Sequence, residues 1–442
     1  MPHHPPRKKS HEWWIVLAII LIAFVFRFQS IKSIPPALHP AEAVNAQDAV
    51  NAIETGEYKV FYPDNNGREG LFINLQTLVV RALDSTEPWV FHIVSAIAGV
   101  LTVLGLYALT KKLFNWQMAA IASFLMAISF WHVMFSRLGF RVILAPLFLV
   151  WAFNYLWRGK QTGELKHYFL SALFWGLGIL SYTSFSIMLI VLVIVLVTYW
   201  GAVSVNFKNR KYTDTRDQII RGFAMILIVI LLMSVPMMIY FNQNPSIVTD
   251  KFIDSPEGII SDSPNSLVNN FISTFDMFTD DGDSNWLFNI PGRSLLFWPV
   301  SILFLAGLLR TFIKFAQSPK KLGHFSTVQV LLISWFFIGL IPALFAGHVP
   351  NAMLALMVAP VVFIFAAEGL WWLYEFISYW HEKRDPHEIT IHGHHLSEGE
   401  FLATLVVVLF LVAMMFVSYD AYFNDWALDS NLQNVFTITN IQ

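Results

Sequence analysis

Residues 222–241 read GFAMILIVILLMSVPMMIYF and contain no charged side chain. A helix needs about 20 predominantly apolar residues to cross the hydrocarbon core of a bilayer, so this stretch predicts a membrane-spanning helix. The whole chain has a matching composition, with 56% hydrophobic, 16% aromatic and 13% charged residues. An average soluble domain has about 25% charged residues. The sequence therefore predicts an all-α polytopic membrane protein.

The same criterion, applied outward from this stretch, finds about eleven candidate spans. They are residues 13–28, 89–109, 116–135, 142–157, 168–182, 185–203, 222–241, 295–315, 328–346, 352–374 and 401–419. We interpret the first as an uncleaved span rather than a signal peptide, because no small-residue cleavage site follows it. The predicted organisation is one transmembrane domain, residues 13–419, between tails of residues 1–12 and 420–442.

The positions of the basic residues predict the orientation of these spans. With the N-terminus inside, every inside segment carries more than one Lys or Arg, and together these segments hold most of the 28 such residues. They are Arg7, Lys8, Lys9, Lys111, Lys112, Arg158, Lys160, Lys166, Lys208, Arg210, Lys211, Arg216, Arg221, Arg310, Lys314, Lys320, Lys321, Lys383 and Arg384. This positive-inside pattern predicts that the C-terminus and two long connections, residues 29–88 and 242–293, lie outside.

Several kinds of chemistry are excluded or disfavoured. The chain has no cysteine, which excludes disulfides, thiolate metal sites and a Cys nucleophile. Its net charge of −2 offers no basic field for nucleic acid. The predicted spans contain few charges, which argues against an ion-coupled transporter. No Gly-rich nucleotide loop of the Walker type is present.

The first long connection contains a predicted amphipathic helix over residues 40–56. Pro40 suits a first helical position and Gly56 suits a C-terminal stop. One side of this helix is apolar and consists of Ala43, Ala46, Val50 and Ile53. Another side is polar and consists of Glu42, Asn45 and Asp48. We expect this helix to lie against the membrane surface. The alternative is a packing helix with a solvated face.

A charged pair follows this helix closely. Asn66 and Gly67 mark a tight turn, and Arg68 and Glu69 come directly after it, before the apolar residues 71–83. A charged pair at the lipid boundary could bind a phosphate head group and a polar acceptor. Alternatively, Arg68 and Glu69 pair with loop neighbours and stabilise the turn.

At these residues the chain resembles the GT-C superfamily of membrane glycosyltransferases. It is similar in particular to bacterial and archaeal proteins related to dolichyl-phosphate-mannose protein mannosyltransferases and lipid A aminoarabinose transferases. The resemblance covers essentially the whole chain and is most specific in residues 56–72. Further matches are residues 135–141 with Pro146, residues 176–178 with Tyr182, residues 282–285 with Asn289, Pro291 and Gly292, residues 349–352 with Pro360, and Tyr422, Phe423 and Trp426.

The resemblance implies a glycosyltransferase that uses a polyprenyl-phosphate-linked sugar donor. The acceptor would be a hydroxyl of a lipid, glycan or protein, and membrane lipids would be further partners. The implied location is the plasma (inner) membrane of a prokaryote, with the active site facing outside. We assign no metal ligands and no certain cofactor from the sequence. A divalent cation remains possible, since Asp280, Asp281 and Asp283 could hold one, although a flexible acidic turn explains them as well.

The chemistry of sugar transfer assigns roles to particular residues. A carboxylate near the acceptor hydroxyl acts as general base or orients it, and the candidates are Glu42 and Glu69. Cationic groups stabilise charge on the leaving phosphate, and we expect Arg68, Arg137 and Arg141 to form that site. The alternative is that these arginines extend to lipid head groups. Candidate substrate-binding residues are Asp64, Asn66, Tyr182, Asp283, Asn285 and His348.

The sequence departs from the family pattern at one informative position. Relatives usually carry an Asp-Glu pair at the start of the first loop helix, whereas this chain has Ala41 and Glu42. Glu42 or Glu69 could take the catalytic role, the chain could be a silent relative, or Ala41 could be an engineered replacement. Two further departures, at Leu287 and Phe288 and at residues 354–356, indicate a changed acceptor or lost chemistry. Besides the enzyme, a non-catalytic subunit that binds lipid-linked sugar or a partner, and a lipid or glycan transporter, remain open.

Overall fold

The computed structural model describes residues 10–64, 67–204, 213–247, 264–317, 324–384, 388–391 and 394–436. Its elements are α1 (Ser10–Phe28), α2 (Pro40–Thr55), β1 (Phe61–Tyr62), β2 (Arg68–Glu69), α3 (Gly70–Leu83), α4 (Pro88–Leu113), α5 (Trp116–Ile128), α6 (Phe130–Ser136), η1 (Arg141–Ile143), α7 (Leu144–Thr162), α8 (Leu165–Ser181), η2 (Thr183–Ile187), α9 (Met188–Ser204), α10 (Thr213–Gln243), α12 (Pro264–Asp276), α13 (Trp298–Ala316), α14 (His324–Gly339), α15 (Ile341–Leu344), η5 (Leu356–Val358), α16 (Ala359–Arg384), β3 (Glu388–Ile391), β4 (His394–Ser397), α17 (Glu398–Asp420), η6 (Ala421–Trp426) and α18 (Ser430–Val435).

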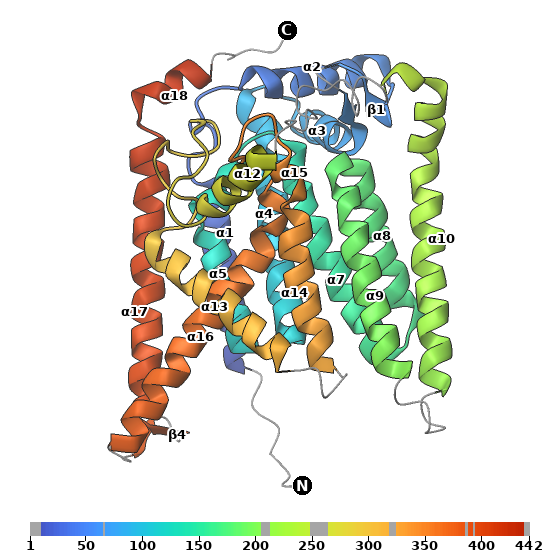
Figure 1. Cartoon of the computed structure of the whole chain (residues 1–442). Coiled ribbons are helices and arrows are strands. Elements are labelled where there is room, and N and C mark those ends of the chain that lie inside the picture. The colour runs from blue at the N-terminus through green and yellow to red at the C-terminus, as the bar shows by residue number, and fades with distance from the viewer. Residues whose placement is uncertain are drawn as a thin grey trace.

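Long helices run side by side between two ends of the molecule, and the two ends differ (Figure 1). The upper end carries α2, α3, α12 and the C-terminus, whereas the N-terminus lies at the lower end. Both long connections that the sequence predicts therefore gather at one end of the bundle. Of the second connection, residues 248–263 lie outside the described residues.

The helices agree with most of the predicted spans. Within the described ranges, eight helices are long and apolar enough to cross a membrane, and there are up to nine if α5 and α6, bent by 62°, form one span. These match all predicted spans except residues 13–28 and 168–182. The two exceptions are also helical, as α1 and α8, but α8 has only 17 residues. A mostly helical polytopic fold is confirmed, while the count of eleven spans and the orientation stay predictions.

The surface helix α2 begins and ends as the sequence predicts. Pro40 is its first residue, and His39 and Glu42 form a reciprocal capping box at its start. Gly56 ends it with a positive φ of 73°, a conformation that costs glycine little. Figure 1 shows α2 lying across the upper end, at a large angle to α10 and α17. This placement fits the predicted amphipathic helix at the end of the bundle.

Burial separates central helices from peripheral ones. The apolar windows of α16 and of the helix Arg141–Thr162 are 83% buried, whereas those of α10 and α17 are only 22% buried. The peripheral helices expose large apolar side chains such as Leu227, Leu232 and Phe416. Apolar surface of this kind is stable against lipid and costly in water. Since η1 and α7 are central, the loop before them is attached to the best-packed part of the molecule.

Two glycines let the central helices α13 and α16 cross closely. A Cβ atom on Gly307 would lie 1.7 Å from the Phe365 carbonyl oxygen, and one on Gly369 would lie 2.0 Å from the Leu303 carbonyl oxygen. Small residues permit such backbone contact between membrane helices. Substitution of either glycine would force the two helices apart.

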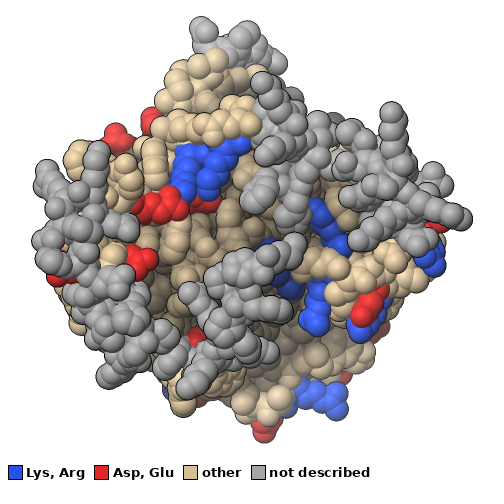
Figure 2. Space-filling model, turned by 90° about the horizontal axis from the view of Figure 1, so that it is seen from below, with Lys and Arg blue, Asp and Glu red and all other residues tan. Residues whose placement is uncertain are grey.

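The lower end carries basic residues in several groups, which Figure 2 shows from below. Some of them pair with carboxylates of neighbouring helices. Lys314 Nζ lies 2.9 Å from Glu368, and Arg310 binds Glu375 at 2.7 Å. These cations belong to the segments that the sequence predicts to be inside.

Candidate functional site

A short hairpin places the charged pair of the first connection. Strands β1 and β2 pair antiparallel, with Phe61 opposite Glu69 and Tyr62 opposite Arg68. Successive side chains of a strand point to opposite faces, so Arg68 and Glu69 face different neighbours. Both side chains are buried. The predicted turn residue Asn66 lies outside the described residues.

Arg68 faces α2 and binds three partners. Its Nη2 lies 2.5 Å from Asp48 Oδ2, its Nη1 donates to Asn45 Oδ1 at 2.7 Å, and its Nε donates to the Asp64 carbonyl at 3.0 Å. Burial raises the pKa of the Asp48 carboxyl, and the neighbouring Arg68 opposes this rise. Burial likewise lowers the pKa of Arg68, and the nearby positive charge of Arg141 adds to that effect. The second arginine is thus close enough to influence the first.

Glu69 faces the other way and holds Arg141. Arg141 Nε donates to Glu69 Oε2 at 2.7 Å, while the Thr183 amide donates to Glu69 Oε1 at 2.9 Å. The Thr183 hydroxyl also hydrogen-bonds to Oε1. The Arg141 guanidinium lies 5.9 Å from the centre of the Tyr182 ring. The structure therefore brings together three predicted site residues, Glu69, Arg141 and Tyr182.

Arg141 keeps donors that bind no described residue. Its side chain is 26% exposed, and only its Nε has a hydrogen bond within the described ranges. The two terminal nitrogens of a guanidinium form a planar fork suited to phosphate. Of the three predicted phosphate ligands, Arg141 is the one whose side chain is both held in place and partly exposed.

Arg137 has a different environment, although it lies only four residues earlier. Its side chain is 0% exposed, and it donates to the carbonyls of Phe26 at 3.2 Å and Ile34 at 2.7 Å. The rings of Tyr422 and Phe423 each lie 5.3 Å from the guanidinium carbon. These contacts tie the loop to α1 and to η6, and they leave no exposed surface for a ligand.

Glu42 is also buried, with 1% of its surface exposed. Its Oε2 accepts from the His39 amide at 2.8 Å, and its Oε1 accepts from the Gly139 amide. His92 Nε2 on α4 lies 3.4 Å from Oε1. Glu42 therefore joins α2, α4 and the arginine-bearing loop, and both of its oxygens are occupied.

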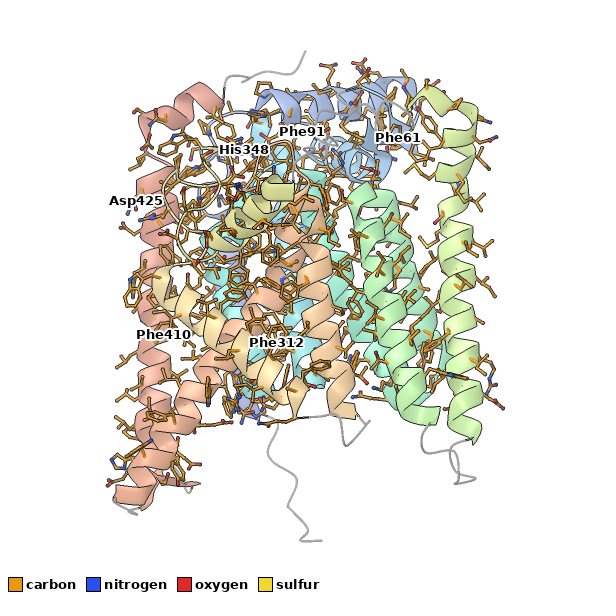
Figure 3. The ribbon with its side chains drawn as sticks, in the orientation of Figure 1. Phe61, Phe91, Phe312, His348, Phe410 and Asp425 are labelled. Atoms are coloured by element: carbon orange, nitrogen blue, oxygen red, sulfur yellow. The ribbon has the colours of Figure 1, made fainter. Side chains whose placement is uncertain are left out.

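Asp283 and Asn285 of the second connection form a separate group with His348, which Figure 3 labels near the upper end. Asp283 accepts from the amides of Asn285 and Ala352, both at 2.9 Å. Burial raises the pKa of Asp283, and these two amides lower it. His348 is exposed, hydrogen-bonds to Ser284 at 3.1 Å, and lies 3.9 Å from Asp283 Oδ1.

Aromatic contacts connect the two groups. The ring of Phe140, which lies between the two loop arginines, is 5.8 Å from the ring of Phe288 and 6.3 Å from that of His39. Phe288 belongs to the second connection and His39 precedes α2. The two long connections and the arginine-bearing loop thus meet at one end.

The sequence reasoning missed three polar members of the site, Asp48, Thr183 and His92. A signal existed for Asp48, since it shares a side of α2 with Glu42 and Asn45. No short-range pattern identifies Thr183 or His92, because their partners are distant in sequence. Among the residues that the structure describes, no group of three or more His, Asp or Glu side chains could hold a metal ion.

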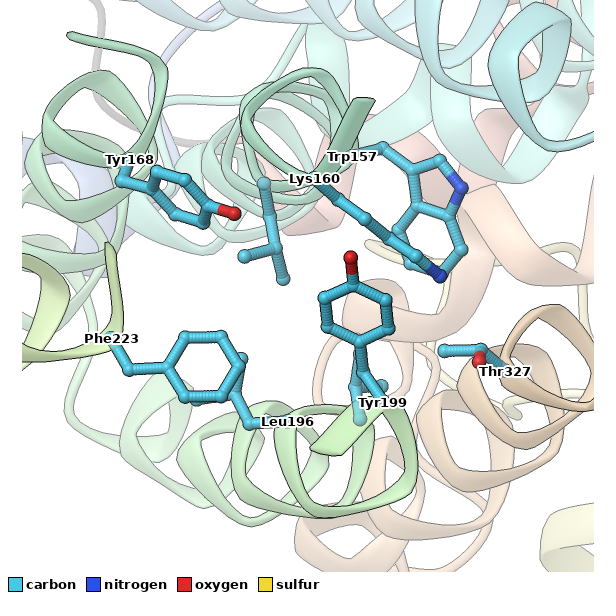
Figure 4. Close-up of a pocket in the computed structure, with 9 residues that line it drawn as sticks. Trp157, Lys160, Tyr168, Leu196, Tyr199, Phe223 and Thr327 are labelled. Atoms are coloured by element: carbon cyan, nitrogen blue, oxygen red, sulfur yellow. The ribbon is translucent and has the colours of Figure 1, made fainter. Parts of the chain in front are cut away.

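A small pocket lies elsewhere, at the ends of α7 and α9 (Figure 4). Its lining includes Lys160, Trp157, Tyr199 and Thr327. Lys160 Nζ lies 4.1 Å from the centre of the Tyr199 ring. Since no predicted site residue lines this pocket, it does not belong to the candidate site.

Comparison with known proteins gives one match to a family model. The family described as dolichyl-phosphate-mannose-protein mannosyltransferase matches residues 71–240. The matched region begins just after Glu69 and includes Arg137, Arg141 and Tyr182. The comparison with curated protein sequences finds no match.

Solved structures share the fold at low sequence identity. The oligosaccharyltransferase of Archaeoglobus fulgidus in its apo form has a TM-score of 0.61 and 17% identity, over 94% of this chain and 56% of that one. The same organism's oligosaccharyltransferase AglB, in complex with an inhibitory peptide and a dolichol-phosphate, has a TM-score of 0.59 and 16% identity, over 99% and 57% of the chains. ArnT of Cupriavidus metallidurans in the apo state has a TM-score of 0.55 and 13% identity, over 94% and 73%.

The chain spans little more than half the length of the oligosaccharyltransferases that it matches. What it shares with them is the helical fold. The family model adds a match in sequence over the segment that carries the arginine-bearing loop. Together, the family match and the shared fold confirm the resemblance to the GT-C superfamily of membrane glycosyltransferases that the sequence motifs predict.

Proposed function

We propose that this chain transfers a sugar from a polyprenyl-phosphate-linked donor to a hydroxyl of a lipid, glycan or protein. The reaction would take place at the upper end, where both long connections meet. The observation that carries the proposal is Arg141, a partly exposed arginine held by a buried carboxylate. A donor of this class also agrees with AglB of Archaeoglobus fulgidus, whose structure contains a dolichol-phosphate.

Arg141 supplies a fixed positive charge, which a leaving phosphate requires. When the bond between the sugar and the phosphate breaks, negative charge grows on the phosphate oxygens, and a fixed cation stabilises it. Glu69 and the Tyr182 ring hold the Arg141 guanidinium in place before the donor binds. Little conformational entropy is therefore lost when the guanidinium binds the phosphate. Hydrogen bonds in which the donor or the acceptor is ionised are about twice as strong as neutral ones.

The other two predicted phosphate ligands act indirectly in this proposal. Arg68 is buried and bound by Asp48, Asn45 and the Asp64 carbonyl, so it shapes the site from the side of α2. Arg137 is enclosed by Tyr422 and Phe423 and fixes the start of the loop. The predicted set of three phosphate arginines is thereby narrowed to one direct contact and two supporting residues.

We further propose that the upper end faces outside, in the plasma membrane of a prokaryote, with about eleven spans in all. The basic residues at the lower end agree with the positive-inside rule. The polyprenyl tail would lie in the hydrocarbon core beside the peripheral helices, since a tail of this kind needs apolar surroundings.

A second candidate is a relative that binds the donor without turning it over. Both predicted catalytic carboxylates, Glu42 and Glu69, are 1% exposed and use both oxygens in hydrogen bonds, and Ala41 stands where relatives have an acid. This candidate predicts binding of polyprenyl phosphate without release of sugar.

The test uses the full chain in lipid nanodiscs with a panel of polyprenyl-phosphate sugars carrying mannose, glucose, arabinofuranose or 4-amino-4-deoxyarabinose. We expect release of polyprenyl phosphate from at least one donor. Arg141→Ala should weaken binding of undecaprenyl phosphate by about 10- to 100-fold, because it removes charge-assisted contacts.

The matched control is Arg81→Ala, which removes an exposed arginine of α3 at the same end and should leave binding unchanged. Release from no donor, with unchanged lipid binding by Arg141→Ala, would overturn the proposal. Binding without release would support the second candidate.

A further inference from the structure

The two predicted catalytic carboxylates are poorly placed to receive a proton. Glu42 accepts hydrogen bonds from His39 and Gly139, and Glu69 accepts them from Arg141 and Thr183. Both are 1% exposed. Their burial and existing hydrogen bonds restrict the access of an acceptor hydroxyl to either carboxylate, which favours a more exposed base.

The side chain of Asp48 is more exposed than those of Glu42 and Glu69. It lies on α2, and its side chain is 15% exposed. Its Oδ2 is held by Arg68 Nη2 at 2.5 Å, whereas its Oδ1 accepts no hydrogen bond from any residue within the described ranges. Asp48 is therefore an oriented carboxylate with one oxygen available to a ligand.

The position of Asp48 relative to Arg141 follows from the hairpin. Arg68 binds Asp48, and the next residue of the chain, Glu69, binds Arg141. The charge of Arg141 is also felt at Arg68. Asp48 and Arg141 are thus each bound to one of two adjacent residues of the same strand.

The charged neighbours of Asp48 are Arg68, Asp64 and Lys59, together with the titratable Tyr62. Burial raises the pKa of Asp48, Arg68 and Lys59 lower it, and Asp64 raises it further. A carboxylate with a raised pKa is a stronger base than an ordinary exposed carboxylate.

We propose that Asp48 is the catalytic base that receives the proton of the acceptor hydroxyl in the sugar transfer proposed above, on which this inference rests. The acceptor oxygen forms the new bond to the anomeric carbon as its proton passes to Asp48 Oδ1. The bond between the anomeric carbon and the phosphate oxygen breaks, and its electron pair leaves with the polyprenyl phosphate at Arg141. Asp48 then releases the proton to water at its exposed edge.

The test compares Asp48→Asn with wild type and with Glu54→Gln, which removes an exposed carboxylate of the same helix. Turnover is measured as release of polyprenyl phosphate from the donor panel, and donor binding is measured separately with undecaprenyl phosphate. We expect Asp48→Asn to lower turnover by about 100-fold or more. Donor binding should stay within about twofold of wild type, and Glu54→Gln should leave both quantities unchanged.

Two further measurements separate a catalytic role from a structural one. Wild-type turnover should rise with pH through the raised pKa of Asp48, because only the ionised carboxylate accepts a proton. The turnover of Asp48→Asn should not show this rise with pH. Asp48→Ala should regain part of its turnover when formate is added, since formate can replace the missing carboxylate.

The outcomes distinguish this inference from the proposed function. No turnover by wild type would overturn both. Wild-type turnover with Asp48→Asn nearly as active would overturn this inference alone. An equal loss of turnover and donor binding, without rescue by formate, would assign Asp48 a structural role and would also overturn it.

Discussion

Arg137 and Arg141 stand at the two ends of one short loop, yet the structure gives them different environments. Arg137 is fully buried between two aromatic rings and bonds to backbone carbonyls of the first connection and α1. Arg141 is partly exposed and bonds to a single carboxylate. The comparison teaches that residue type and position near the boundary do not define a phosphate ligand. A phosphate ligand also needs hydrogen-bond donors without a partner and a side chain that a ligand can reach.

The largest expected effect comes from Arg137→Ala. It would leave one buried and one partly buried carbonyl without this donor and a gap beside Tyr422, which should cost about 3 kcal/mol of stability. We expect a clear drop in the unfolding temperature of the detergent-purified chain. A stable Arg137→Ala protein that has lost donor binding would reverse the assignment of the two arginines.

Arg141→Ala should show the opposite pattern and a smaller change in free energy. Its partner Glu69 keeps the two bonds from Thr183, so the unfolding temperature should stay close to that of wild type. The loss should appear in binding of undecaprenyl phosphate, where the tenfold to hundredfold weakening corresponds to about 1.4–2.7 kcal/mol. The comparison fails if the unfolding temperature of Arg141→Ala falls as far as that of Arg137→Ala.

Glu69→Gln should have the smallest effect of the three. The amide can still accept a hydrogen bond, but it removes the negative charge that holds the Arg141 guanidinium. We expect binding of undecaprenyl phosphate to weaken by roughly three- to tenfold, or about 0.7–1.4 kcal/mol. Isothermal titration in nanodiscs would measure it. Loss of all turnover with normal binding would instead support Glu69 as a catalytic group.

The fold could be predicted largely from local sequence. Apolar length located the spans, and Pro40 and Gly56 located both ends of α2, because each of these signals acts within a few residues. The hairpin and the start of α3 after Glu69 also agree with the turn expected at Gly67. Spans such as α8 were harder to judge, since a 17-residue helix lies at the limit of the length criterion.

The candidate site could be predicted only in part. The charged pair Arg68 and Glu69 and the loop arginines were identified, and the structure does bring Glu69 next to Arg141. Which arginine remains accessible depends on Phe26, Ile34 and Tyr422, whose contacts with Arg137 cross long stretches of sequence. Asp48 was recognised only as a member of a polar helix side, because its significance depends on Arg68.

The location of Arg141 on η1 has a mechanical consequence. The residue begins the 3-10 turn that continues without a break into α7, and this helix lies in the best-buried part of the bundle. Because its backbone belongs to this well-buried helix, Arg141 can move towards a ligand only by rotation of its own side chain. In the proposed reaction the lipid would therefore bring its phosphate to a stationary backbone position, and the depth of η1 would determine how far the head group must rise from the membrane.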